Sequence, residues 1–284
     1  MHIIPEKLFA FPVKLLEFLN DKKINIIFWV PSALCLVANL KALGKFNLDN
    51  INKILFCGEV MPNKQLNMWR KHYPNVLFAN LYGPTEITDV CSYYIVDRKF
   101  NDADALPIGK ACKNTDILVL NDKNELVEKH EIGELCVRGF SLAYGYYNNP
   151  EKTAEAFVQN PLNKAYPEVI YRTGDLVRYN EYNELIYVSR KDFQIKHMGH
   201  RIELGEIETA ISAVAGIEQS CCVYDDRKSK IVMFFVGNID AEHIINVLKE
   251  NLPDYMLPNK KVKLEKMPIN LNGKIDRVKL KEML

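Results

Sequence analysis

Hydrophobic and polar positions follow two different spacings along the first third of the chain. Residues 8–19 carry apolar side chains at helical spacing, whereas residues 24–30 form a short run rich in β-branched and aromatic side chains. The same succession continues with a helix starting at Pro31, a strand at 54–57, a helix at 62–72 and a strand at 76–79. Strands that alternate with helices predict an α/β layer.

The spacing changes near residue 106. Short apolar runs separated by Gly, Asn and Asp turns predict strands at 116–120, 134–138 and 185–189. This succession indicates a small β-rich subdomain.

The last ninety or so residues return to a mixed pattern. They predict a helix at 205–213, strands at 220–224 and 231–236, and a helix at 241–251. We therefore expect a compact α+β domain at the C-terminus, and a fold class of α/β plus α+β for the whole chain.

Charge and apolar content exclude several classes of partner. The 284 residues carry 37 basic and 36 acidic side chains, so no overall field attracts nucleic acid or an anionic membrane. The longest apolar stretch, 24–38, is interrupted by polar residues and a proline and is too short for a membrane span. We expect neither a nucleic-acid partner nor membrane insertion.

Cysteine usage and the N-terminus indicate a cytoplasmic protein. The seven cysteines lie within apolar runs and include no C-x-x-C pair, which is typical of reduced, buried thiols rather than of a metal site or disulfide framework. The first residues lack the basic leader and apolar core of a signal peptide.

The first candidate for chemistry is the run YGPTE at 82–86. A planar base can lie on the Tyr82 ring, and Gly83-Pro84 bends the backbone. Thr85 can donate to a phosphate, and Glu86 is an oxygen ligand suited to Mg²⁺. A plain turn after a strand is the alternative interpretation.

Two later runs extend this interpretation. Asp175 follows a glycine at the end of an apolar stretch and could accept both hydroxyls of a ribose. Lys274 lies in the run LNGKIDR at 271–277, where a flexible positive charge could reach phosphate oxygens. Each also fits an ordinary turn, so the order of the three motifs is more informative than any one of them.

The run SRKDFQIKHMGHRIELGEIE at 189–208 completes the pattern. With it, the chain resembles the adenylate-forming enzymes. Within them it is most similar to the amino-acid adenylation domains of non-ribosomal peptide synthetases and to the D-alanine:D-alanyl carrier protein ligases. The motifs occur in the family's order, joined by LPIG at 106–109, GEL at 133–135 and LPDYMLP at 252–258.

The resemblance implies two domains and a hinge. Residues 1–191 would be part of an AMP-binding N-terminal domain, with the α/β layer at 1–105 and the β-rich subdomain at 106–191. Residues 192–284 would be a mobile C-terminal domain that turns at Asp192.

The resemblance also implies ATP and Mg²⁺ as cofactors and assigns a role to each motif. Lys274 would be catalytic, bridging the carboxylate and phosphate oxygens, and Glu86 would bind Mg²⁺. The residues implied to bind the nucleotide are Gly58, Glu59, Asn80, Leu81, Tyr82, Gly83, Pro84, Thr85, Asp175, Tyr187 and Arg190.

A second half-reaction would transfer the acyl group to the phosphopantetheine thiol of a carrier protein supplied in trans. By resemblance, Lys196 and Gly199 would meet the pantetheine. The chain departs from the family here, because Met198 stands where an arginine is common and Ser189 replaces the glycine usual before Arg190.

The amino-acid pocket implied by the motifs gives two opposing signals. A cysteine at the position of Cys57 narrows the pocket in the D-alanine ligases, which favours D-alanine. A carboxylate at Asp89 instead suits a polar or cationic side chain. The implied pocket residues are Phe28, Leu55, Cys57, Leu81, Asp89 and Val90.

Two family elements are missing from this chain. It contains neither the Ser/Thr/Gly-rich loop that holds the β- and γ-phosphates nor the Phe-Asp element that binds the substrate ammonium. We therefore expect the C-terminal part of an enzyme, inactive alone. The alternatives are an acyl-CoA synthetase of the same superfamily and a non-catalytic carrier-binding fragment.

Overall fold

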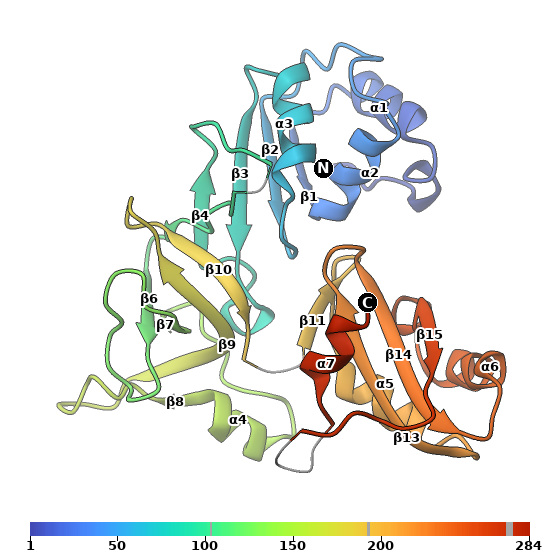
Figure 1. The fold of residues 1–284 in the computed structure, drawn as a ribbon. Coiled ribbons are helices and arrows are strands. Elements are labelled where there is room, and N and C mark those ends of the chain that lie inside the picture. The colour runs from blue at the N-terminus through green and yellow to red at the C-terminus, as the bar shows by residue number, and fades with distance from the viewer. Residues whose placement is uncertain (103, 192–193, 271–274) are drawn as a thin grey trace. The chain divides into compact units, whose positions relative to one another are not determined.

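The chain divides into two compact units, Met1–Lys191 and Asp192–Leu284. The computed structural model describes residues 1–102, 104–191, 194–270 and 275–284 (Figure 1). The expected fold class, α/β plus α+β, is confirmed in these residues.

The first unit begins with a five-stranded sheet in the order β1-β2-β3-β4-β5. The first three strands are parallel and the last two pairings are antiparallel. The strands are β1 (Ile26–Trp29), β2 (Lys53–Cys57), β3 (Leu77–Tyr82), β4 (Ser92–Ile95) and β5 (Lys110–Ala111).

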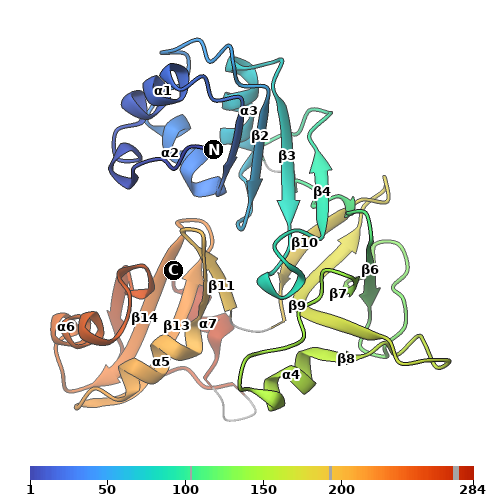
Figure 2. The same ribbon diagram turned by 180° about the vertical axis from the view of Figure 1, so that it is seen from behind.

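Three helices lie together beside strands β1 to β3 (Figures 1 and 2). They are α1 (Pro12–Asp21), α2 (Pro31–Asn39) and α3 (Asn63–His72). The first helix starts at Pro12 rather than at the expected residue 8, because a 3₁₀ turn, η1 (Glu6–Leu8), precedes it and proline suits the first helical position.

The helices bury one face of this sheet. Ile27, Ile54 and Phe78 come from successive strands and pack with helix residues in one core cluster. Trp69 of α3 is fully buried, and its indole N–H donates to the Leu34 carbonyl of α2 at 2.9 Å. This bond satisfies the polar group of a large core side chain.

The opposite face of the same sheet is not buried by these helices. Register pairs Phe28 with Leu55, and Cys57 with Leu81, and paired residues on neighbouring strands point to the same side. They alternate with the buried residues and therefore share the other face. Phe28 is 51% exposed. We call this surface the open face; it comprises Ile26, Phe28, Lys53, Leu55, Cys57, Leu77, Ala79, Leu81, Tyr93 and Ile95.

The second sheet of the first unit is antiparallel and ordered β10-β9-β7-β6, with β8 paired to β9. Its strands are β6 (Thr115–Leu120), β7 (Gly133–Gly139), β8 (Phe157–Gln159), β9 (Val169–Tyr179) and β10 (Leu185–Arg190). The short helix α4 (Pro150–Ala156) precedes β8.

Asp175 lies within β9, a strand that the apolar pattern of the sequence did not predict. The neighbouring Gly174 has a φ of +72°, and the pairing of β7 with β9 shifts register between Glu134 and Cys136. The glycine therefore marks an irregularity within a long strand. The strand continues beyond it to Tyr179.

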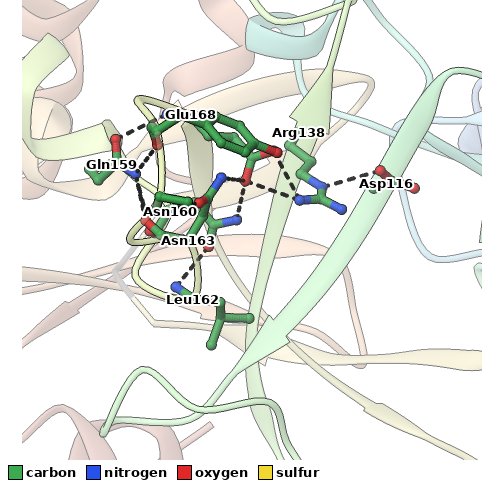
Figure 3. A network of polar contacts seen from close by, with 9 residues as sticks. Asp116, Arg138, Gln159, Asn160, Leu162, Asn163 and Glu168 are labelled. Atoms are coloured by element: carbon green, nitrogen blue, oxygen red, sulfur yellow. Dashed lines mark hydrogen bonds and ion pairs between the residues drawn. The ribbon is translucent and has the colours of Figure 1, made fainter.

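A polar network fastens the segment between β8 and β9 to the sheet (Figure 3). Arg138 of β7 contacts Asp116 of β6 at 3.1 Å and Glu168 at 3.0 Å. Asn160 donates to Glu168 at 2.5 Å, and this bond, together with Asn163 and Arg138, lowers the pKa of the Glu168 carboxyl. The network therefore connects the segment between β8 and β9 to strands β6 and β7.

The second unit contains a hairpin, a three-stranded sheet and helices. The hairpin consists of β11 (Gln194–His197) and β12 (His200–Glu203), and the sheet is ordered β13-β14-β15. The remaining elements are α5 (Leu204–Ser212), β13 (Ile217–Asp225), β14 (Lys230–Gly237), α6 (Ala241–Asn251), η3 (Asp254–Met256), β15 (Lys260–Lys263) and α7 (Arg277–Glu282).

Both faces of this sheet are covered. Met233 and Phe235 of β14 pack in a cluster with residues of α5 and α6, whereas Val232 and Phe234 pack in a cluster that includes Leu280 of α7. The alternation along one strand therefore supplies two cores.

Candidate active site

The turn that carries the first motif follows directly from β3. Tyr82 ends the strand, and Glu86 lies in the 3₁₀ turn η2 (Thr85–Ile87). A Cβ on Gly83 would overlap the Asp89 carbonyl oxygen and lie 2.8 Å from the Cys91 nitrogen, so only glycine fits this approach. The Cys91 N–H donates to the Tyr82 carbonyl at 2.9 Å and closes the loop.

Two non-glycine residues in this loop adopt left-handed backbone conformations. Thr88 has a φ of +61°, which β-branched residues rarely adopt, and Asp89 has a φ of +80°, which aspartate adopts more readily. The Thr88 hydroxyl donates to the Ser141 carbonyl at 2.8 Å. The surroundings thus hold a strained turn next to the motif.

Two residues from other strands, Tyr82 and Arg190, meet at Asp175. The Tyr82 hydroxyl donates to one carboxylate oxygen, and Arg190 donates to the other at 2.9 Å. Arg190 also donates to the Thr173 carbonyl at 2.9 Å. Asp175 is 1% exposed, so its negative charge requires this pairing. The cluster joins β3, β9 and β10.

The pKa of Tyr82 lies well above its ordinary value. Burial is the largest cause, and the neighbouring Asp175 charge adds to it. Tyr82 is therefore a neutral donor at physiological pH. Because an ionised carboxylate offers about four lone-pair sites, Asp175 has capacity for further donors beside Tyr82 and Arg190.

Several nucleotide-binding residues predicted from the sequence already have structural partners. Tyr82 is 4% exposed, and its ring belongs to a core cluster with Ile87 and Cys91. The Asn80 amide donates to the Pro107 carbonyl at 2.8 Å. The predicted contacts of both residues with the base stay predictions.

Gly58 and Glu59 follow β2. Gly58 has a φ of +98°, which favours glycine. The Glu59 carboxylate accepts from the Ser32 N–H at 2.8 Å, at the first turn of α2. A carboxylate there satisfies an unpaired helix N–H and interacts favourably with the helix dipole.

Glu86 is held by residues from the segment between β7 and α4. It is 8% exposed, and its carboxylate accepts from the Tyr146 hydroxyl at 2.6 Å. Its backbone carbonyl accepts from the Ala143 N–H at 2.8 Å. Sequence reasoning missed Tyr146, because nothing local links it to a residue sixty positions earlier.

The donor set at Glu86 suits one kind of metal. The described residues contain no group of three His, Cys, Asp or Glu side chains that could hold a metal ion. Mg²⁺ commonly uses one or two carboxylates and completes its shell with substrate phosphates and waters. A single carboxylate at Glu86 therefore fits Mg²⁺ bound together with a nucleotide.

The predicted pocket residues divide into two groups. Phe28, Leu55, Cys57 and Leu81 share the open face of the first sheet. Asp89 and Val90 instead follow η2 in the turn that packs against Gly83. Asp89 is exposed, whereas Cys57 is buried.

The other predicted residues lie as follows. Pro84 is buried and Thr85 exposed, and Tyr187 on β10 is half-buried opposite Val177. In the second unit, Lys196 lies on β11, and Gly199 (φ +81°) follows Met198 in the hairpin turn. The predicted hinge Asp192 and the predicted catalytic Lys274 lie outside the described residues.

Thr173 is a further residue that the sequence did not single out. Its hydroxyl donates to the Leu135 carbonyl at 2.7 Å and accepts from the Asp175 N–H at 3.0 Å. It thereby fixes the backbone of Asp175 to β7. The sequence signal that could have identified Thr173 is its position two residues before Asp175.

Comparisons with known proteins agree on one family. A model of the AMP-binding enzyme family matches residues 1–147. The chain is 35% identical to Delta-poly-L-ornithine synthetase of Acinetobacter baumannii (strain AB307-0294) over 98% of its own length and 21% of that protein. It is 35% identical to Zwittermicin A synthase ZmaJ of Bacillus cereus over 94% of its length and 52% of that protein.

A solved structure shares the fold. PA1221, described as an NRPS protein containing adenylation and PCP domains bound to a vinylsulfonamide inhibitor, superposes with a TM-score of 0.81 at 26% identity. The match covers 96% of this chain and 47% of that one. The chain thus spans about half, or less, of the proteins it matches. None of the helices in its described part combines the length and apolar character needed to cross a membrane.

Proposed function

Because the chain belongs to the AMP-binding enzyme family, we propose that it contributes to an ATP-dependent ligase that activates an amino acid as an aminoacyl adenylate. The acyl group would then pass to the phosphopantetheine thiol of a carrier protein. The observation that carries this proposal is the buried cluster of Tyr82, Asp175 and Arg190. It unites three positions that the adenylate-forming motifs assign to the nucleotide.

The proposed role of Asp175 is to orient the ribose. Its carboxylate would accept the ribose hydroxyls while Arg190 holds one of its oxygens at 2.9 Å. Tyr82 stays neutral and holds the other oxygen, so the acceptor is oriented before the nucleotide binds. Such preorganisation reduces the reorganisation required on binding.

Adenylate formation brings two anions together, the substrate carboxylate and the α-phosphate. Glu86 would hold Mg²⁺, which when bound supplies positive charge beside the phosphate oxygens. Lys274 would contact the carboxylate and phosphate oxygens, as the family motif implies. In the transfer step, Lys196 and Gly199 would meet the pantetheine of the carrier protein. A relative described as containing adenylation and PCP domains supports such a partner.

D-alanine is the proposed substrate. Cys57 is buried on the same sheet face as Phe28, Leu55 and Leu81, where it would narrow the pocket around a small side chain, as the resemblance to the D-alanine ligases implies. Such a pocket would discriminate between side chains that differ by one methylene by about 1–3 kcal/mol.

A basic amino acid is the second candidate. The Asp89 side chain is exposed beside the motif, and a carboxylate there suits a positively charged substrate. One relative at 35% identity is named Delta-poly-L-ornithine synthetase, which supports this alternative.

A panel of non-hydrolysable aminoacyl sulfamoyl-adenosines tests the proposed function. Calorimetry on the 284-residue chain would measure the Kd of the D-alanyl, L-ornithyl and acetyl compounds. We expect the D-alanyl compound to bind most tightly, and Asp89→Ala to leave that preference unchanged. Asp122→Ala, at an exposed carboxylate, is the matched control.

Each of the other possible results would favour a different substrate or a different class of enzyme, or would reject adenylate recognition. Tightest binding of the L-ornithyl compound, lost in Asp89→Ala, would replace D-alanine with a basic amino acid. Tightest binding of the acetyl compound, which lacks an amine, would favour an acyl-CoA synthetase. Binding of none of them would reject adenylate recognition by this chain.

A further inference from the structure

Tyr146 donates a short hydrogen bond to the Glu86 side chain. Its hydroxyl donates to the carboxylate at 2.6 Å, within the range of charge-assisted O–H···O⁻ bonds. The two residues come from different segments, η2 and the connection between β7 and α4. The bond therefore depends on how these segments pack.

The Tyr146 ring is fixed on several sides. It meets the Phe157 ring edge-on with centroids 5.8 Å apart, and the Lys152 ammonium lies 5.4 Å from the Tyr146 ring centroid. The Tyr146 N–H donates to the Thr153 hydroxyl at 2.9 Å. Packing and backbone contacts thus help to orient the ring, and its hydroxyl also lies 3.4 Å from the Tyr171 hydroxyl.

The same segment also holds the backbone of the motif turn. The Ala143 N–H donates to the Glu86 carbonyl at 2.8 Å, and the Ser141 carbonyl accepts from the Thr88 hydroxyl at 2.8 Å. These bonds set the position of the Glu86 backbone. The hydroxyl of Tyr146 adds a hydrogen bond to the Glu86 side chain.

We propose that Tyr146 is a positioning residue that holds the Glu86 carboxylate in the orientation needed to bind a divalent cation with ATP. This inference rests on the proposed function, because it assigns the cation to Glu86. Hydrogen-bond partners of metal-binding carboxylates fix ligand orientation, and their loss typically weakens metal affinity about 10- to 100-fold.

Tyr146→Phe tests the proposal, since it removes the hydroxyl and retains the ring. Tyr144→Phe and Tyr147→Phe make the same chemical change at two neighbouring side chains that are 107% and 101% exposed. For each protein, electron paramagnetic resonance would measure the Kd of Mn²⁺ in the presence of saturating ATP. Calorimetry would measure the Kd of ATP without metal, and a thermal melt would report folding.

We expect Tyr146→Phe to weaken Mn²⁺ binding by about tenfold or more. Its metal-free ATP affinity and melting temperature should remain close to those of the wild type, and both control variants should match the wild type throughout. This separation of metal affinity from nucleotide affinity would distinguish positioning from a general structural role.

Three results would overturn the proposal. Equal Mn²⁺ affinities in Tyr146→Phe and the controls would reject it and leave the proposed function intact. A parallel loss of ATP affinity and melting temperature would assign Tyr146 a structural role. Absence of ATP binding by the wild-type chain would reject the proposed function, and the inference with it.

Discussion

The hydroxyl of Tyr82 donates a hydrogen bond to the carboxylate of Asp175, a residue 93 positions later in the chain. Tyr82 ends a strand of the first sheet, whereas Asp175 lies within a strand of the second. The bond therefore connects the two sheets of the first unit at the predicted nucleotide site. Burial and the Asp175 charge both keep the hydroxyl protonated.

This bond predicts a specific dependence of stability on alkaline pH. The pKa of Tyr82 is raised on folding, so its contribution to stability is fully present below the unfolded pKa of about 10. It is lost as pH rises above 10, because the unfolded chain then releases a proton that the folded chain retains. Tyr82→Phe removes this contribution, so the free energy of unfolding should fall less steeply above pH 10 in the variant than in the wild type.

Urea unfolding of the wild type and of Tyr82→Phe between pH 8 and 11 would measure the effect. Tyr73, Tyr94 and Tyr179 also have raised pKa values, so the difference between the two proteins is the informative quantity. At pH 8 the variant should be less stable by about 1.5–3 kcal/mol, since Asp175 loses a donor. Identical pH dependence in both proteins would contradict the assignment.

Two glycines should respond oppositely to the same substitution. A Cβ at Gly83 would overlap the backbone of residues 89–91, so Gly83→Ala should destabilise the first unit by roughly 1–3 kcal/mol. Gly205 lies in α5 with nothing within 4 Å of an added Cβ. Gly205→Ala should stabilise the second unit by about 0.5–1 kcal/mol. Chemical denaturation of both variants checks the signs, and a neutral Gly83→Ala would refute the close approach.

The ion pair of Arg277 with Glu208 should stabilise the second unit. Arg277 donates to Glu208 and to the Cys222 carbonyl, both at 2.6 Å, and Glu208 accepts from the Cys222 N–H at 2.6 Å. These bonds fasten the start of α7 to β13 and α5. Removing a charged donor from a half-buried network costs about 2–3 kcal/mol.

Arg277→Ala is therefore expected to lower the unfolding free energy of the second unit by that amount. Lys279→Ala, at an exposed position of the same helix, is the control and should have little effect. Equal unfolding midpoints for the two variants would show that the Arg277 network adds nothing to stability.

Local patterns in the sequence predicted much of the secondary structure. The strand at β2 and the helix at α3 rest on apolar spacing within ten residues, and the structure has both near the predicted positions. The strand β9, which contains Asp175, was not predicted, because Gly174 and the polar residues beside it interrupt the apolar pattern. Only the pairing of β9 with β7 shows that the strand continues across the glycine.

The candidate site was less accessible from the sequence. The motifs named Tyr82, Glu86 and Asp175, but the bond from Tyr146 to Glu86 crosses sixty positions and depends on tertiary packing. Glu59, predicted to line the adenine, accepts a hydrogen bond from the first turn of α2, which the motif alone does not indicate. A sequence motif identifies a residue without identifying which neighbours already occupy its polar atoms.

The central claim is that Asp175 recognises the ribose of an adenine nucleotide. Calorimetry on the 284-residue chain would compare the Kd of AMP with that of 2′,3′-dideoxy-AMP, for the wild type, Asp175→Asn and the exposed control Asp122→Asn. We expect the wild type and the control to prefer AMP by about 100-fold or more, because 2′,3′-dideoxy-AMP loses two hydrogen bonds to a charged group, each worth about 1.5–3 kcal/mol. Asp175→Asn should lose most of that preference. Equal binding of the two nucleotides by the wild type, or an undiminished preference in Asp175→Asn, would contradict the account.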